Sequence, residues 1–268
     1  MTDSPDRKIE YYETGSGAPV LFVPGSFSTS VAWRSMQKCL PDGYRCIGTS
    51  ICGYGETSET RSGDDFDIAH EVAVIEMAAQ RIGSPIHLVG HSFGGTVALA
   101  AALSGRIDVR SLATFEANPL NLMREHGDID LYESVQRMAA DFEEAHDAGE
   151  RDAAARIIDF WGGTGSFAAL PESVQDYCRQ TAAANVLDWH TCFGFTLTRQ
   201  DLSRLGIPVL IVRGGLANPA MVVISGVLDE GLPKSRQEVV EGASHFLIST
   251  HPSECAELLS GFLAANSG

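Results

Sequence analysis

The chain has 268 residues, and its 35 acidic side chains against 19 lysines and arginines give a formal net charge of −16. This excess of negative charge excludes nucleic acid and anionic membrane surfaces as partners, because most of the protein surface would repel both. The length is enough to bury one sizeable core, and we expect a single unit that carries an insertion. The stretch Met1–Lys8 lacks an apolar signal segment, and no later apolar run could span a bilayer, so we expect a cytoplasmic protein.

The spacing of cysteines and histidines gives no sign of a metal site. The six cysteines include no C-x-x-C pair, which favours buried free thiols over disulfides or metal ligands. His126, His146 and His190 are not spaced as metal ligands either. No glycine-rich loop suited to phosphate is present, so we expect neither a metal nor an organic cofactor.

Apolar runs separated by turn residues predict a series of buried strands. The expected strands are Ile9–Thr14, Val20–Val23, Tyr44–Thr49, Ile86–Val89, Leu112–Glu116 and Ile207–Gly215. A helix is expected from Asp64 to Arg81, because apolar residues repeat along it at steps of three and four. Between Leu120 and Leu205 the pattern changes to helical segments rich in Ala, Asp and Glu. Strands alternating with helices predict an α/β fold.

One serine stands between two glycines where a predicted strand passes into a small-residue helix. The segment Gly90-His91-Ser92-Phe93-Gly94 follows the strand Ile86–Val89, and the helix is expected over Thr96–Leu103. A G-x-S-x-G sequence in this context is typical of a nucleophile elbow, a strained turn that exposes the serine hydroxyl beside a helix N-terminus. Ser92 is therefore the predicted nucleophile.

These residues, with those described below, make the chain resemble the α/β-hydrolase superfamily over nearly its whole length. The resemblance implies a mostly parallel central sheet flanked by helices, with a helical cap inserted into it. It assigns residues 1–119 and 206–268 to the catalytic core and residues 120–205 to the cap.

The resemblance also implies an oxyanion hole made of two main-chain N–H groups. In the superfamily the loop after the first inner strand usually begins with His-Gly, and here it reads Pro24-Gly25-Ser26. By position the donors are the N–H groups of Ser26 and of Phe93, the residue after the nucleophile. Proline replaces the histidine of the pattern, but a main-chain donor does not depend on that side chain.

Aromatic residues of the cap are candidates for the substrate pocket, although each could equally serve core packing. Aromatic side chains occur at positions 160, 161, 167, 189, 193 and 195. The predicted substrate-binding residues are Phe27 of the core loop and Trp161, Trp189 and Phe193 of the cap.

The general base and its partner come from loops later in the chain. The sequence Gly242-Ala243-Ser244-His245-Phe246 resembles the superfamily's histidine loop and makes His245 the predicted base. The superfamily usually supplies the third member after the strand that here ends near Arg213, but Asn218 stands where Asp is expected. Some members carry the acid one strand earlier, where this chain has Glu116. Glu116 is the favoured acid, with Asn218 as the alternative histidine partner and a carboxylate such as Asp229 as a third possibility.

These residues favour a serine hydrolase that cleaves a small carboxylic ester through an acyl-enzyme intermediate. Carbon–carbon bond hydrolysis, acyl transfer or lyase chemistry on a related carbonyl compound is the alternative, since fold alone does not fix function. A ligand-binding protein that has lost turnover is a third interpretation, motivated by the asparagine at position 218. The expected partner is a small-molecule substrate, and the expected assembly is a monomer or homodimer.

Overall fold

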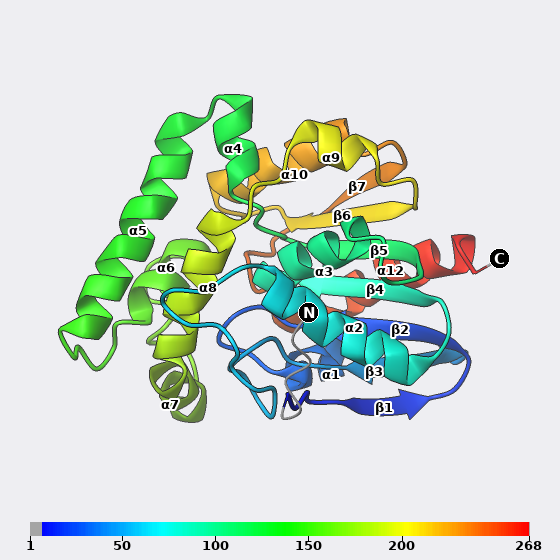
Figure 1. The fold of residues 1–268 in the computed structure, drawn as a ribbon, viewed down its shortest axis with the longest axis horizontal. Helices are drawn as coiled ribbons and strands as arrows, with labels where there is room; N and C mark the ends of the chain where they lie inside the picture. Colours follow the sequence, from blue (N-terminus) through cyan, green and yellow to red (C-terminus); the bar gives the residue numbers. More distant parts are fainter. Residues whose placement is uncertain (1–6, 268) are drawn as a thin grey trace.

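The computed structural model describes residues 7–267, and these form a seven-stranded sheet flanked by helices (Figure 1). The strands follow the order β1-β3-β2-β4-β5-β6-β7, and only β1 runs antiparallel to its neighbour. Their bounds are β1 (Tyr12–Gly15), β2 (Ala18–Val23), β3 (Tyr44–Gly48), β4 (Ile86–His91), β5 (Val109–Phe115), β6 (Val209–Gly214) and β7 (Ser235–Val240). The predicted α/β fold with a mostly parallel sheet is confirmed.

Thirteen helical segments of the described residues connect and cover these strands. They are the 3₁₀-helix η1 (Ser30–Trp33) and the α-helices α1 (Arg34–Gln37), α2 (Ala69–Ile82), α3 (Phe93–Leu103), α4 (Asn121–His126), α5 (Ile129–Asp147), α6 (Ala155–Gly162), α7 (Glu172–Gln180), α8 (Ala182–Gly194), α9 (Arg199–Ser203), α10 (Pro219–Gly231), α11 (Leu247–Thr250) and α12 (Pro252–Ala265). Of these, α2, α3 and α10 pack on one face of the sheet, and α1, α11 and α12 form the layer on the other.

The apolar core lies on both faces of the sheet because side chains alternate along each strand. On β2, Leu21 and Val23 pack into the cluster that contains α2, α3 and α10, whereas Val20 and Phe22 pack into the cluster that contains α12. All four side chains are fully buried. Burial on both faces explains why the inner parallel strands read as continuous apolar runs instead of alternating ones.

The segment between β5 and β6 is helical, from α4 to α9. Helices α5, α6, α7 and α8 stand together at one end of the sheet (Figure 1). Residues of α6, α7 and α8 meet the ends of β4 and β5 around one pocket. These helices therefore supply one wall of the space above the strand ends.

Helix α2 and strand β1 both begin later than the sequence suggested. Helix α2 starts at Ala69, not Asp64, because Ser62 and Asp65 exchange main-chain hydrogen bonds in a turn, and the Asp67 side chain accepts the N–H of Ala69 at 2.8 Å. The aspartates thus precede the helix, where a carboxylate satisfies an otherwise unpaired N–H. Strand β1 begins at Tyr12, three residues after the expected start.

Five cysteines are buried, as expected for free thiols, but Cys39 is exposed. The N-terminal segment 1–6, on which part of the expected location rests, lies outside the described residues. Across residues 7–267, none of the helices combines the length and apolar character needed to cross a bilayer.

Candidate active site

Ser92 sits in a sharp turn between β4 and α3. Its φ of 54° lies in the left-handed region, which is rare for a residue with a side chain and stores strain. The turn fits only because its neighbours lack side chains: a Cβ on Gly94 would collide with the main chain of Pro24, and one on Gly90 with the main chain of Gly94. The sequence therefore folds locally into the predicted elbow, with Ser92 only partly buried.

The structure brings Ser92, His245 and Glu116 together, although they are far apart in the sequence. His245 Nε2 lies 3.0 Å from Ser92 Oγ, and His245 Nδ1 lies 2.7 Å from Glu116 Oε2. Since a carboxylate only accepts hydrogen bonds, the contact with Glu116 fixes the proton on Nδ1 and leaves Nε2 free to take the serine proton.

Glu116 follows the last residue of β5 and is only 1% exposed. Its φ of 48° turns the chain sharply out of the strand, and its second oxygen, Oε1, accepts the N–H of Gly214 at 2.8 Å. Burial alone would raise the pKa of Glu116, but the hydrogen bond and charge of His245, with the N–H of Gly214, hold it below its ordinary value. The carboxyl is therefore ionised where it contacts the imidazole.

His91, the residue before the nucleophile, supports the histidine loop. Its Nε2 lies 2.9 Å from the main-chain oxygen of His245, and the two rings lie 5.0 Å apart. That oxygen can only accept, so His91 Nε2 carries the proton. Burial and the neighbouring His245 lower the pKa of His91 to about 3, which keeps this ring neutral.

The two predicted oxyanion donors, the N–H groups of Ser26 and Phe93, belong to different loops beside Ser92. Ser26 follows β2, and Phe93 opens α3. Neither N–H donates to an acceptor within residues 7–267. Both remain available to a ligand. The N–H of Phe93 is one of the first N–H groups of α3, which a helix leaves unpaired.

A buried ionic network lies beside the Ser26 loop. Arg61 Nη1 contacts Asp188 Oδ1 of α8 at 2.8 Å and Glu71 of α2 at 3.1 Å, and the Tyr54 hydroxyl donates to Asp188 Oδ2 at 2.7 Å. Burial raises the pKa of Asp188 above its ordinary value, although the charge of Arg61 opposes the shift. Asp188 thus links α8 to the segment that carries Tyr54 and Arg61.

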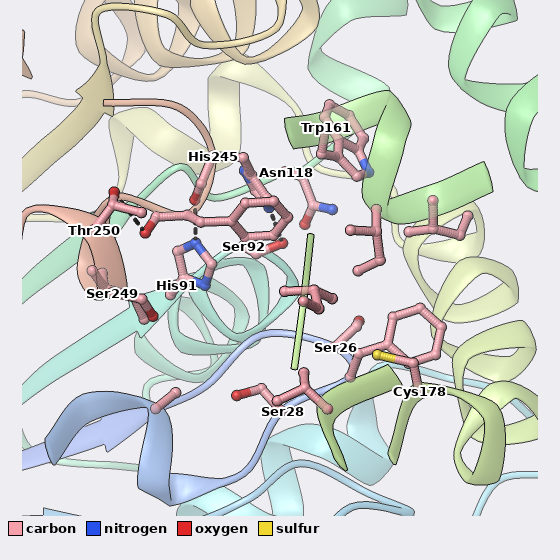
Figure 2. A pocket seen from close by; sticks show the side chains of 18 of the residues that line it. Ser26, Ser28, His91, Ser92, Asn118, Trp161, Cys178, His245, Ser249 and Thr250 are labelled. Atoms are coloured by element: carbon pink, nitrogen blue, oxygen red, sulfur yellow. Dashed lines mark hydrogen bonds between the residues drawn. The ribbon is translucent and has the colours of Figure 1, made fainter. Parts of the chain in front are cut away.

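A mostly apolar pocket of about 320 Å³ opens above Ser92 (Figure 2). Three of the four predicted substrate residues line it, namely Phe27, Trp161 and Trp189. The Trp161 ring lies 5.5 Å from the His245 ring and stacks on Trp189 at 6.3 Å. The pocket is also lined by Ile157, Ile158, Leu170, Val174, Cys178, Phe246 and Ile248, with Asn118, Ser28, Ser249 and Thr250 as polar members.

Two predicted residues lie elsewhere. Phe193 is not part of the pocket lining, because it lies one helical turn beyond Trp189 on α8 and packs against Trp189 and Tyr132. Asn218 does not contact His245: its Oδ1 accepts the N–H of Ala220 at the start of α10, and its Nδ2 donates to the main-chain oxygen of Phe160 at 3.0 Å. The structure therefore favours Glu116 over Asn218 as the histidine partner.

Several residues near the site were not singled out from the sequence. Asn118 lines the pocket, and the partners Arg61 and Asp188 are 127 positions apart. No local pattern pairs two such residues, because the contact arises only when α8 packs onto the core. The position of Asn118, two residues after Glu116 at the same strand end, was the one available signal.

Within residues 7–267 no group of three or more His, Cys, Asp or Glu side chains is arranged to hold a metal ion.

Comparison with known proteins places this chain in a family. The family model described as the alpha/beta hydrolase fold matches residues 18–252, which is most of the chain. The chain belongs to the α/β-hydrolase family. The prediction that it is an α/β-hydrolase, and an enzyme of that class, is confirmed.

The relatives of this α/β-hydrolase are distant and chemically varied. It is 26% identical over 253 residues to the non-heme chloroperoxidase CPO-A1 of Kitasatospora aureofaciens, which covers 89% of this chain and 88% of that protein. It is 25% identical over 261 residues to a pimeloyl-acyl-carrier-protein methyl ester esterase of Aeromonas salmonicida, covering 93% and 96%. The structure of an esterase from Exiguobacterium antarcticum matches with a TM-score of 0.77 at 21% identity over 97% of both chains, a likeness of fold.

Proposed function

We propose that this α/β-hydrolase is a serine carboxylic ester hydrolase that works through an acyl-enzyme intermediate. The observation that carries the proposal is the chain of contacts from Ser92 Oγ to His245 Nε2 at 3.0 Å and from His245 Nδ1 to Glu116 at 2.7 Å. A hydroxyl, an imidazole and a carboxylate in this order form a catalytic triad, in which the imidazole activates the hydroxyl and the carboxylate orients the imidazole.

In the acylation half-reaction, Ser92 Oγ attacks the ester carbonyl while its proton passes to His245 Nε2. The charge that develops on the carbonyl oxygen accepts hydrogen bonds from the N–H groups of Ser26 and Phe93, which have no acceptor within the described residues. His245 then gives its proton to the departing alcohol oxygen, and the acyl group stays on Ser92.

In the deacylation half-reaction, water takes the place of the alcohol. His245 accepts a proton from the water as the water attacks the acyl carbonyl, and the same two N–H groups hold the second oxyanion. His245 returns the proton to Ser92 Oγ as the acid leaves. Glu116 remains ionised throughout and stabilises each imidazolium that forms.

The pocket supports a small ester as substrate. Its volume of about 320 Å³ lies at the lower end of the range of ligand pockets, roughly 300 to 1,000 Å³. Trp161, Trp189 and Phe27 give it apolar walls suited to a short acyl or alkyl group. The methyl ester esterase among the relatives agrees with ester chemistry in this fold.

The test is hydrolysis of a chain-length series of p-nitrophenyl esters by the wild type and by Ser92→Ala. We expect turnover that peaks at short acyl chains in the wild type, and a loss of at least about 10³-fold in the variant. Product analysis separates simple hydrolysis from acyl transfer to added alcohols. Equal rates in the wild type and Ser92→Ala would overturn the proposal.

A further inference from the structure

One polar side chain is built into the pocket beside the nucleophile and has no part in the mechanism above. Asn118 lies two residues after Glu116, is 3% exposed and lines the pocket. Figure 2 shows its amide group next to Ser92 and facing the pocket. A buried amide in a mostly apolar pocket costs stability unless its polar atoms find partners.

The orientation of the Asn118 amide is fixed by Thr96 of α3, which is fully buried. Thr96 Oγ1 accepts the main-chain N–H of Asn118 at 3.0 Å and donates to Asn118 Oδ1 at 2.9 Å. A hydroxyl has one proton, and this proton goes to Asn118, so the atom facing Thr96 is the amide oxygen. The amide nitrogen then faces the other way.

The backbone around Asn118 is held as firmly as its side chain. The Cys192 thiol of α8 contacts the main-chain oxygen of Asn118 at 3.2 Å. Gly95 allows the segment to approach α3 closely, since a Cβ there would come within 2.8 Å of the Ala117 Cβ. The amide is thus preorganised before any ligand arrives.

The donor that remains is Asn118 Nδ2, for which no acceptor is found among residues 7–267. The pocket that Asn118 lines has mostly apolar walls, which include the side chains of Ile157, Trp161 and Trp189. A preorganised donor beside the reacting atom, in apolar surroundings, is the arrangement that recognises an acceptor on a ligand and discriminates against a ligand that lacks one.

We propose that Asn118 is a specificity-determining residue whose Nδ2 donates a hydrogen bond to a second oxygen of the substrate. The preferred substrates are then esters that carry an acceptor oxygen, such as a keto or ether oxygen, close to the scissile carbonyl. This inference rests on the proposed ester hydrolysis, and adds to it the chemical class of the substrate.

The test uses two matched pairs of esters, followed by acid release at constant pH. On the acyl side, methyl 3-oxopentanoate is compared with methyl pentanoate, and on the alcohol side, 2-methoxyethyl butanoate with butyl butanoate. The ratio of kcat/KM within each pair is measured for the wild type, Asn118→Asp and Asn118→Leu. Comparing ratios between enzymes cancels the difference in intrinsic reactivity of the esters.

We expect the ratio to fall about 10-fold in both Asn118 variants for one of the two pairs, as for the loss of one hydrogen bond. That pair shows whether the acceptor oxygen lies on the acyl or the alcohol side. Asn118→Asp keeps the shape and the contact with Thr96 but presents an acceptor instead of a donor. Thr96→Val, which frees the amide to rotate, lowers the same ratio by about 3-fold, whereas the matched control Thr96→Ser keeps the wild-type ratio.

Labelling of Ser92 by a fluorophosphonate distinguishes a failure of the Asn118 inference from a failure of the proposed ester hydrolysis. It also shows which variants are folded. If Ser92 is labelled in every enzyme and the ratios of both pairs stay unchanged in both Asn118 variants, the inference is overturned while ester hydrolysis stands. If the wild type hydrolyses none of the four esters and Ser92 is not labelled, the proposed function fails and the inference fails with it.

Discussion

Strands β5 and β6 are parallel neighbours that end at the same edge of the sheet, yet the residues just past their ends do different work. Glu116 turns back under the histidine loop, contacts His245 and receives the N–H of Gly214 at the end of β6. Asn218, after β6, begins α10 and holds the main-chain oxygen of Phe160 on α6. One strand end serves the histidine, and the other ties the helical segment to the core.

The difference shows that the sheet edge, and not one particular strand, provides the carboxylate. Parallel strands deliver several side chains to one edge, and the residue that can reach Nδ1 becomes the partner. Glu116 reaches it at 2.7 Å from a position with a φ of 48°, where the chain turns sharply out of β5. The asparagine after β6 is then free to act as a helix N-cap.

The largest expected effect comes from replacing Glu116, the residue that follows β5. Glu116→Gln should lower kcat by about 10³- to 10⁴-fold, because a neutral amide neither stabilises the imidazolium nor enforces the tautomer. Asn218→Ala should change kcat by less than about 3-fold, since the two hydrogen bonds that it removes do not involve the triad. Steady-state kinetics on the best p-nitrophenyl ester give both values. A larger loss of kcat in Asn218→Ala than in Glu116→Gln would show that Glu116 is not the acid.

A double variant, Glu116→Gln with Asn218→Asp, is the matched control. Because the side chain at 218 faces Ala220 and Phe160, an aspartate there should not restore the lost activity. Recovery of more than 10-fold would show that both strand ends can serve His245.

A smaller effect is expected on stability from the β6 side. Asn218→Ala removes the cap of α10 and the hydrogen bond to Phe160, and should lower the free energy of unfolding by about 1–2 kcal/mol. Urea unfolding measures the change, and Asn218→Ser, which keeps a capping oxygen, should recover part of it. If Asn218→Ala were as stable as the wild type, the hydrogen bond from Asn218 to Phe160 on α6 would not stabilise the fold.

An effect of similar size, present only at acidic pH, concerns His91 at the end of β4 on the same edge. Its pKa is lowered to about 3 in the folded protein, whereas the unfolded chain takes up a proton below the ordinary value of about 6.5. The unfolded state therefore binds more protons between these values, and the free energy of unfolding falls as the pH drops below 6.5. The contribution of this ring has a slope of roughly 1.4 kcal/mol per pH unit at most.

Replacing His91 by Gln isolates that contribution from the other titrating groups. The variant should lose less stability than the wild type between pH 7 and pH 5 when both are unfolded in urea. Parallel pH profiles would show that the ring is not held neutral.

Much of this arrangement could be predicted from local sequence. The motif around Ser92 depends on contacts within a few residues. His245 could be predicted as the base because it lies in a characteristic loop and follows the serine along the chain. Glu116 could be proposed because a strand end in a parallel sheet defines an edge. The start of α2 was misplaced, since aspartates that cap a helix look the same in sequence as aspartates in its first turn.

The rest depends on tertiary packing that no local pattern records. Phe193 lies one turn beyond Trp189 on the same face of α8, so the position of α8 along its own axis, relative to the core, decides which of the two rings borders the pocket. The contact between Arg61 and Asp188 likewise exists only once α8 is docked. The amide nitrogen of Asn118 faces the pocket because the hydroxyl of Thr96 on α3 holds the amide oxygen. Neither sequence segment alone could predict this orientation of the amide.

The most direct test of the proposed triad is the rate at which a fluorophosphonate labels the protein, with the modified residue located by peptide mass spectrometry. The proposed triad predicts one adduct, on Ser92, formed fast by the wild type and by Asn218→Ala, slowly by Glu116→Gln and His245→Ala, and not at all by Ser92→Ala. An adduct on another residue, or labelling of Glu116→Gln at the wild-type rate, would contradict it.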